Sequence, residues 1–237
     1  KKRGEKMDQF FNAARPEITI GGKDHFLYLF IIIALLTLLF CYQRQVKIYE
    51  KTVMWIVLLL ALIQRGLSLA YFISIGEYTL AEALPLHICR LVCLFIILQF
   101  FLQKDWLDQI IFFWGLFAYA SFVYPVEISP LTHVMGITFV LLHSLNILFP
   151  LVRYFTVGFV PSFRGSLLAV VLFAIYLPLV AVFNELTDGN YFYLVERPFF
   201  HNMASLPYFL LNFFGVSIAF LMVGLVFDKI GKARDIH

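Results

Sequence analysis

The sequence predicts an all-α polytopic membrane protein, a bundle of seven transmembrane helices. Of its 237 residues, 62% are hydrophobic and 14% are charged, and the mean hydropathy is +0.87. Soluble domains average roughly 45–50% apolar and about 25% charged residues. The composition therefore excludes an ordinary soluble domain and indicates a chain embedded in a bilayer.

Seven long apolar runs are the candidate spans. They fall at residues 26–42, 53–75, 86–102, 106–124, 132–152, 167–183 and 207–227. A transmembrane helix needs about 17–25 apolar residues, and each run is too long for a strand. We find no internal repeat and no low-complexity linker. The expected organisation is an N-terminal segment at 1–24, one transmembrane domain at 25–228 and a cytoplasmic tail at 229–237.

The lysine and arginine residues predict the orientation, because basic residues concentrate in cytoplasmic loops. One side of the bundle carries nine of them: Arg44, Lys47, Lys51, Lys104, Arg153, Arg164, Lys229, Lys232 and Arg234. The other side carries Arg15, Lys23 and Arg197. Residues 1–6 are left out, since we expect Met7 to be the natural start and the six residues before it to be an expression addition. The N-terminus is therefore expected outside and the C-terminus inside.

The charge and the cysteines exclude two other classes of protein. The net charge is +3, and the basic residues are dispersed rather than gathered in a stripe, so we expect no nucleic-acid partner. Cys41, Cys89 and Cys93 all lie in apolar segments, which does not indicate a disulfide framework.

Residues 84–90, Leu-Pro-Leu-His-Ile-Cys-Arg, place three polar side chains at the start of the third span. Such residues are costly inside a membrane and mark functional sites. Pro85 suits the first turn of a helix, which would put Cys89 in the second turn beside Arg90. A helix N-terminus or a nearby cation stabilises the thiolate, the reactive form of cysteine. Cys89 is therefore a candidate nucleophile; the alternative is a small buried hydrophobe, the role expected of Cys93.

A nucleophile needs a base, and His143 in the fifth span is the candidate. His87 lies two residues from Cys89, a separation of about 200° on a helix, so it is expected to face away and to share a face with Arg90. Asn146, one turn beyond His143, is placed to hydrogen-bond either that histidine or a substrate. The alternative for His143 is a hydrogen-bonded core histidine without a catalytic role.

Metal binding is the competing use of these residue types. No His-x-x-x-His, Glu-x-x-His or Cys-x-x-Cys pattern occurs on one helix face. His87, Cys89 and His143 would form a zinc site only if the fold brought them together. We expect neither a metal nor another cofactor.

Arg65 lies near the centre of the second span, where an arginine costs about 2.5 kcal/mol or more. It is expected to face the interior of the bundle and to pair with Glu127, with Glu82 or with a lipid phosphate. The longest external loop, 184–206, contains Asn190 and Tyr191, which are candidates for shaping a lid or binding a substrate. Its Asp-Gly-Asn sequence alone is simply a turn signal.

Three stretches together resemble a known family: Leu-Pro-Leu-His-Ile-Cys-Arg at 84–90, the span with His143, and the segment from Asn184 through Asn190 to Pro198. They are similar to the YwaF-type bacterial integral membrane proteins. These in turn resemble the animal transmembrane acyltransferase that remodels ether phospholipids and, more distantly, the androgen-induced-gene type lipid hydrolases, which use a threonine nucleophile. The resemblance spans nearly the whole chain. It implies a seven-helix bundle in a bacterial cytoplasmic membrane, enclosing a catalytic cysteine and histidine that map onto Cys89 and His143.

The main functional hypothesis is therefore a lipid acyltransferase or transacylase with its site opening toward the outer leaflet. Cys89 would take an acyl group from a membrane phospholipid as a thioester, with His143 as base, and pass it to a lysophospholipid. The expected substrate-binding residues are His87, Arg90, Arg65, Asn146, Asn190 and Tyr191. The alternatives are a hydrolase with the same pair, a non-catalytic lipid-binding or transport bundle, and a seven-helix sensor or assembly partner. The sequence leaves the acyl donor, the acceptor, the chain length and the oligomeric state open.

Overall fold

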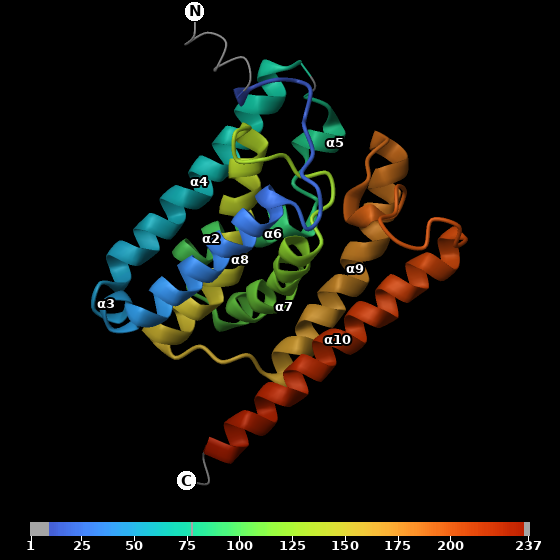
Figure 1. Cartoon of the computed structure of the whole chain (residues 1–237). Coiled ribbons are helices and arrows are strands. Elements are labelled where there is room, and N and C mark those ends of the chain that lie inside the picture. Colours follow the sequence, from blue (N-terminus) through green and yellow to red (C-terminus); the bar gives the residue numbers. More distant parts are fainter. Residues whose placement is uncertain (1–9, 77, 235–237) are drawn as a thin grey trace, which may run out of the picture.

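The computed structural model describes residues 10–76 and 78–234, and in this part every regular element is helical. The side chains of residues 82, 83 and 232–234 are outside the description. The elements are α2 (Lys23–Cys41), α3 (Gln43–Ile48), α4 (Glu50–Ser74), α5 (Leu80–Ala83), α6 (Ile88–Leu102), α7 (Asp105–Val123), α8 (Val134–Val157), α9 (Phe163–Thr187), the 3-10 turn η1 (Tyr191–Tyr193) and α10 (Ser205–Arg234) (Figure 1). The expected start at Met7 and the residues before it lie outside the described residues.

Six helices are long and apolar enough to cross a membrane: α2, α4, α7, α8, α9 and the stretch Ser205–Gly231 of α10. The expectation of an all-helical membrane protein is therefore confirmed for the described residues. The third predicted span corresponds to α6, which has only 15 residues and is about 22 Å long, against a hydrocarbon core of about 30 Å. Whether α6 completes a seventh crossing stays a prediction, and so does the orientation.

The late start of α6 has a local cause in Pro85. A proline disfavours helical backbone at the residue before it, and Leu84 is extended at φ −73° and ψ 128°. His87 is also extended, at φ −61° and ψ 129°, and it serves as the N-cap of the helix that begins at Ile88. The expected helix start at Pro85 is therefore wrong by three residues.

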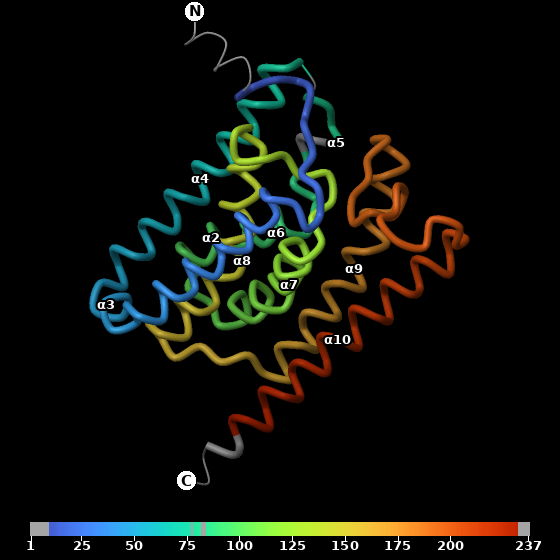
Figure 2. Tube along the Cα trace, viewed as in Figure 1, coloured from blue at the N-terminus to red at the C-terminus, as the bar shows by residue number. Residues whose placement is uncertain are grey.

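Helix α8 is the centre of the bundle and packs against α4, α6 and α7, with α2 and α3 on its flank. Helices α9 and α10 form an antiparallel pair at one side, and α10 packs chiefly on α9 (Figures 1 and 2). At Gly224 of α10 an added Cβ would collide with the side chain of Ser166 on α9, so small residues allow the two helices to approach closely. The main apolar core lies among α4 and α6 to α10.

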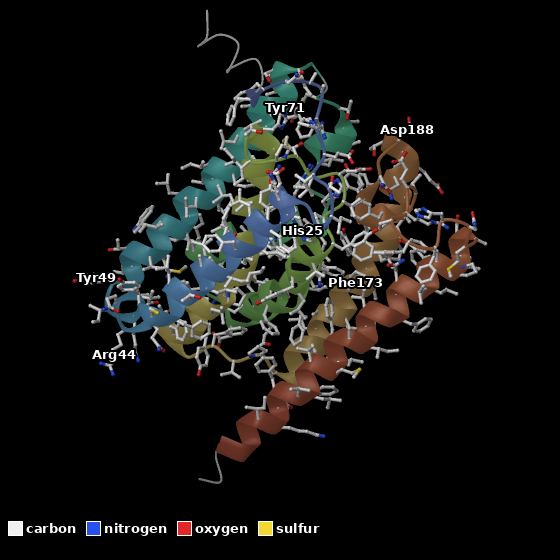
Figure 3. All side chains as sticks on the ribbon, in the orientation of Figure 1. His25, Arg44, Tyr49, Tyr71, Phe173 and Asp188 are labelled. Atoms are coloured by element: carbon white, nitrogen blue, oxygen red, sulfur yellow. The ribbon has the colours of Figure 1, made fainter. Side chains whose placement is uncertain are left out.

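The two ends of the molecule can be followed in Figure 3. Tyr71 and Asp188 lie toward the end at which the N-terminal segment runs, whereas Arg44 and Tyr49 lie toward the opposite end. Residues 10–22 cross the first of these ends before α2 begins (Figure 2). The predicted tail from residue 229 continues α10 as far as Arg234.

A buried ion pair joins α7 and α8 below the core. The Nε of Arg153 donates to both carboxylate oxygens of Asp108 at 3.0 and 3.1 Å, and its Nη2 lies 2.9 Å from Oδ2. Arg153 was expected in a loop, but α8 extends to Val157 and buries it. This correction leaves eight rather than nine basic residues on the predicted inner side, against three on the other.

Candidate functional site

A cavity of about 450 Å³ opens within the bundle, with walls from α4, α6, α7 and α8. Cys89 and His143, the two candidate catalytic residues, both line it, and so do His87 and Arg90. The loop after η1 and the first turns of α10 complete its wall. Four of the eight predicted site residues thus line one cavity. His87, Cys89 and Arg90 lie at the start of α6, and His143 lies on α8.

Cys89 is the second residue of α6 and lies in its first turn, not in the second turn as expected. Its side chain is 9% exposed, and no side chain among the described residues caps the helix start. The N-terminal end of a helix carries a partial positive charge, which favours an anion such as a thiolate. The start of α6 therefore places Cys89 where the helix dipole favours an anion.

His87 and Cys89 do not face away from each other as the helical rotation predicted. That argument assumed that both residues are helical, whereas His87 stands in extended backbone just before α6. Both side chains therefore reach the same cavity. The ring of His87 also packs edge-on against Tyr191, with the ring centres 5.1 Å apart.

Asn146 fixes α8 against α6 at the position of the thiol. Its Nδ2 donates to the backbone carbonyl of Cys89 at 3.0 Å, and its Oδ1 is buried with no hydrogen-bond partner among the described residues. The Cys89 thiol interacts with the side chains of Asn146 and Ser121. Asn146 is therefore a neighbour of Cys89, although its side chain does not form part of the cavity wall.

Ser121 is a site residue that the sequence did not reveal. It lies on α7, lines the cavity, and donates a hydrogen bond to the carbonyl of Phe117 at 3.1 Å. This bond uses the hydroxyl hydrogen and leaves an oxygen lone pair for the thiol. A single serine in an apolar run gives no sequence signal, because its importance depends on a cysteine of another helix.

His143 is held in one orientation by its own helix. Its Nδ1 lies 2.8 Å from the carbonyl oxygen of Phe139, which can only accept, so Nδ1 carries the hydrogen. In the neutral ring Nε2 is then unprotonated and available as a base. The ring also packs against Phe139 and Phe122, at centroid distances of 4.2 and 6.3 Å. The backbone carbonyl of Phe139 thus fixes the orientation of the His143 ring, as a carboxylate orients the histidine of a catalytic triad.

Charged and phenolic groups also line the cavity. Arg15 lines it from the N-terminal segment, with its guanidinium 4.9 Å from the ring centre of Phe72. Glu127 and Tyr193 also line it. Burial and the nearby Glu127 carboxylate raise the pKa of Tyr193 to about 12, so this phenol remains a hydrogen-bond donor at neutral pH.

The N-terminal segment is tied across this end of the bundle. The hydroxyl of Tyr71 donates to the backbone carbonyl of Asn12 at 3.0 Å, and Nε2 of His133 lies 2.9 Å from the same oxygen. The amide of Ile18 donates to the carbonyl of Ile128 at 2.8 Å. These contacts hold the segment so that Arg15 reaches the cavity.

The loop after α9 is held to α9 and α5 by hydrogen bonds at Tyr191 and not at Asn190. The side chain of Asn184 exchanges two hydrogen bonds with the backbone of Tyr191, at 2.7 and 3.0 Å, and the Tyr191 hydroxyl donates to the carbonyl of Ala81 at 2.7 Å. Asn190 hydrogen-bonds within the loop, to the backbone of Val195 and Glu196. Neither Asn190 nor Tyr191 lines the cavity, and their substrate-binding role stays a prediction.

Strained backbone gathers where this loop meets the cavity. Phe192, Tyr193 and Glu127 all line the cavity and all have left-handed backbone, with φ of 57°, 51° and 53°. Such strain in residues other than glycine is concentrated at ligand clamps and active sites. The loop therefore has the features expected of a lid. Tyr191 holds it to α9 through Asn184 and to α5 through Ala81.

Arg65 lies beside the cavity and not on its wall. Its Nη1 is buried and has no hydrogen-bond partner among the described residues. Arg90 and Cys93 are close enough to interact with it electrostatically. The expected partner Glu127 lines the cavity instead, and the side chain of Glu82 is outside the described part. No group of three or more histidine, cysteine or acidic side chains within the described residues is arranged to hold a metal ion.

Six membrane-length apolar helices, three of which (α4, α7 and α8) line a cavity within the bundle together with α6, define a polytopic integral membrane protein. More specifically, the chain belongs to the TMEM164 family, whose sequence pattern matches residues 20–226. The match covers every residue of the cavity wall except Arg15. No curated protein and no solved structure matches the chain.

Proposed function

We propose that this protein is a membrane-embedded lipid acyltransferase that moves a fatty acyl group between phospholipids and lysophospholipids through a thioester on Cys89. The observation that carries the proposal is that Cys89 and His143 line one cavity inside an apolar bundle. Cys89 lies at a helix start, and Nε2 of His143 is available as a base. The resemblance of both positions to the acyl-transferring proteins described above supports the same assignment.

The first half-reaction forms the thioester. His143 Nε2 accepts the proton of the Cys89 thiol, and the thiolate attacks the ester carbonyl of the donor lipid. The tetrahedral intermediate collapses with cleavage of the bond between the acyl carbon and the alcohol oxygen. His143 returns its proton to that oxygen, which releases a lysophospholipid and leaves the acyl group on Cys89.

The second half-reaction reverses these roles. The hydroxyl of a lysophospholipid gives its proton to His143 while its oxygen attacks the thioester carbonyl. The carbon–sulfur bond breaks, and the thiolate regains a proton from His143. The enzyme returns to its starting state, and water in place of the lysophospholipid would give hydrolysis.

The developing oxyanion needs donors, and the start of α6 supplies them. The first backbone N–H groups of a helix point along its axis and have no partner within it; in α6 the amides of Arg90 and Leu91 donate to the carbonyl of His87 at 2.8 and 3.0 Å, so the donors would be those of Ile88 and Cys89. Arg90, in the same turn, lines the cavity as well. Positioned donors of this kind typically supply the largest single term in catalysis.

The cavity walls suit an amphipathic substrate. Phe117, Phe139, Leu142 and Phe192 provide apolar surface, while Arg15, Arg90 and Glu127 lie on the polar side. A lipid presents the same division between acyl chains and head group. We propose that the chamber opens toward the outer leaflet, on the side to which the N-terminal segment is tied.

The proposal is tested by the intact mass of the purified protein after incubation with phospholipid. We expect an added acyl mass on Cys89 that hydroxylamine removes, and its transfer to added lysophospholipid. Cys89→Ala should show neither the adduct nor transfer, and His143→Ala should form the adduct slowly. Cys41→Ala is the matched control, because Cys41 is exposed at the far end of α2. Undiminished acyl transfer by folded Cys89→Ala protein would overturn the mechanism.

A further inference from the structure

Polar side chains of α4 also line the cavity. Gln64 and Ser68 are four residues apart and therefore share one face of that helix. They are 2% and 4% exposed, and both line the cavity together with Thr138 of α8. The mechanism proposed above uses none of these three residues.

The amide of Gln64 is held in a defined orientation. Its Nε2 donates to the backbone carbonyl of Thr138 at 3.4 Å, so Oε1 is the atom left over. Oε1 is buried and has no hydrogen-bond partner among the residues that the structure describes. The hydroxyl of Thr138 cannot supply a donor, because it donates to the carbonyl of Met135 at 2.9 Å.

The unpartnered atom fixes the chemistry of the ligand group that would bind there. Amide Oε1 only accepts hydrogen bonds, so it selects a donor and disfavours phosphate oxygens and ester carbonyls. Hydroxyl and ammonium groups are both donors. Arg65 follows Gln64 in the chain, and its Nη1 is buried with no hydrogen-bond partner among the described residues. This positive charge disfavours an ammonium group and leaves a neutral hydroxyl as the preferred partner.

We propose that Gln64 forms a head-group subsite that binds a hydroxyl of a polyol phospholipid, such as one with a glycerol head group. The proposal rests on the proposed function for the identity of its ligand as a lipid substrate. The hydroxyl bound at Gln64 is not the reacting one, because the hydroxyl that attacks the thioester must give its proton to His143. Gln64 therefore determines which lipids enter and takes no part in the chemical step.

The experiment measures lipid binding in Cys89→Ala protein, so that it does not depend on acyl transfer. The probes are phosphatidylglycerol and phosphatidylpropanol with the same acyl chains. They have equal charge and equal head-group carbon number, but the second has no head-group hydroxyl. We expect phosphatidylglycerol to bind about tenfold more tightly, the size of one ordinary hydrogen bond to a buried acceptor. Binding is followed by native mass spectrometry and by competition with a fluorescent lipid.

Substitution at Gln64 assigns the preference to this residue. Gln64→Met has a similar volume without the acceptor and should bind both lipids equally. Gln64→Glu retains an acceptor oxygen and should retain the preference, which keeps the test open if Gln64→Met does not fold. Ser144→Ala is the matched control, because it removes another buried unpartnered polar atom that does not line the cavity.

Three results would overturn the subsite. The first is equal binding of the two lipids by protein with an intact Gln64. The second is a hydroxyl preference that persists in Gln64→Met. The third is tighter binding of phosphatidylethanolamine than of phosphatidylglycerol with loss of that difference in Gln64→Met, which would assign the site to ammonium. If protein with an intact Cys89 shows no acyl transfer, the proposed function is wrong, whereas the binding results at Gln64 stand unchanged.

Discussion

Two of the places at which the bundle buries polar groups differ in how far these groups are hydrogen-bonded within the protein. Between α7 and α8 the guanidinium of Arg153 meets both carboxylate oxygens of Asp108, and neither side chain reaches the cavity. Beside Cys89 and on the cavity wall, by contrast, Asn146 and Gln64 each keep one buried oxygen without a partner among the described residues. The ion pair is hydrogen-bonded within the protein, whereas these two acceptors are available to a ligand or to water.

Whether a buried polar group has a partner within the protein distinguishes residues that stabilise the fold from residues expected to act in function more clearly than the residue type does. Breaking a buried ion pair leaves an uncompensated charge, so such a pair is retained for the integrity of the fold. Buried acceptors without partners lower stability unless a ligand or water meets them. We therefore expect changes near Asp108 to affect folding first and changes near Cys89 to affect activity first.

The largest expected effect is that of Cys89→Ala on acyl transfer. Loss of a nucleophile removes the covalent route, and we expect a fall of at least about 1000-fold. The midpoint of thermal unfolding should stay close to that of the unchanged protein, because the thiol is a small buried group. Activity and unfolding measured on the same preparation test the two statements together. A large loss of stability in this variant would break the comparison.

Arg153→Met should produce the opposite pattern. Removing Arg153 leaves the buried Asp108 carboxylate without its cation and with the side chain of Gln99 as its remaining hydrogen-bond partner among the described residues, at a cost of roughly 3–5 kcal/mol in the free energy of unfolding. The double variant Asp108→Leu with Arg153→Met should recover most of that loss, since replacing both partners by apolar groups is often neutral. Activity per folded molecule should remain. Denaturation in detergent measures the first quantity, and a double variant as unstable as Arg153→Met would contradict the assignment.

Asn146→Ala is expected to have an intermediate effect. It removes the hydrogen bond that ties α8 to the carbonyl of Cys89 and so loosens the alignment of thiol and imidazole. We expect acyl transfer to fall about 10- to 100-fold through kcat, as misplacement of reacting groups does. Steady-state kinetics with varied lipid separates kcat from KM. A change confined to KM would make Asn146 a substrate-binding residue instead.

Tyr193→Phe should have the smallest effect, and it depends on pH. Because the pKa of Tyr193 is raised to about 12, the phenol stays protonated between pH 6 and 9 and adds no step to the activity profile there. A raised pKa gives stability that is present below about pH 10, the unfolded value, and is lost as the pH rises toward 12. Tyr193→Phe should therefore lose less stability than the unchanged protein between pH 9 and 11, measured by thermal unfolding.

Much of the fold follows from the apolar runs, because a bilayer leaves helices as the main way to satisfy the backbone. That Cys89 and His143 line one cavity could also be predicted, since polar residues inside spans are few. Arg153 was misplaced because its partner Asp108 is 45 residues away, and nothing local shows that a helix continues past the apolar run. The spacing of Gln64 and Ser68 was a usable signal, but its meaning depends on a cavity.

The shortness of α6 has a consequence for how a lipid would reach the site. Helices α6 and α7 are joined by a tight turn at Gln103 and pack side by side, but α7 has 19 residues and α6 has 15. The start of α6 therefore lies about 6 Å short of the far end of α7. Under the proposed function, a thiol set back from the end of α7 would meet the ester linkages of a lipid below the membrane surface. A substrate could enter sideways from its own leaflet, with its chains remaining in the hydrocarbon layer throughout the reaction.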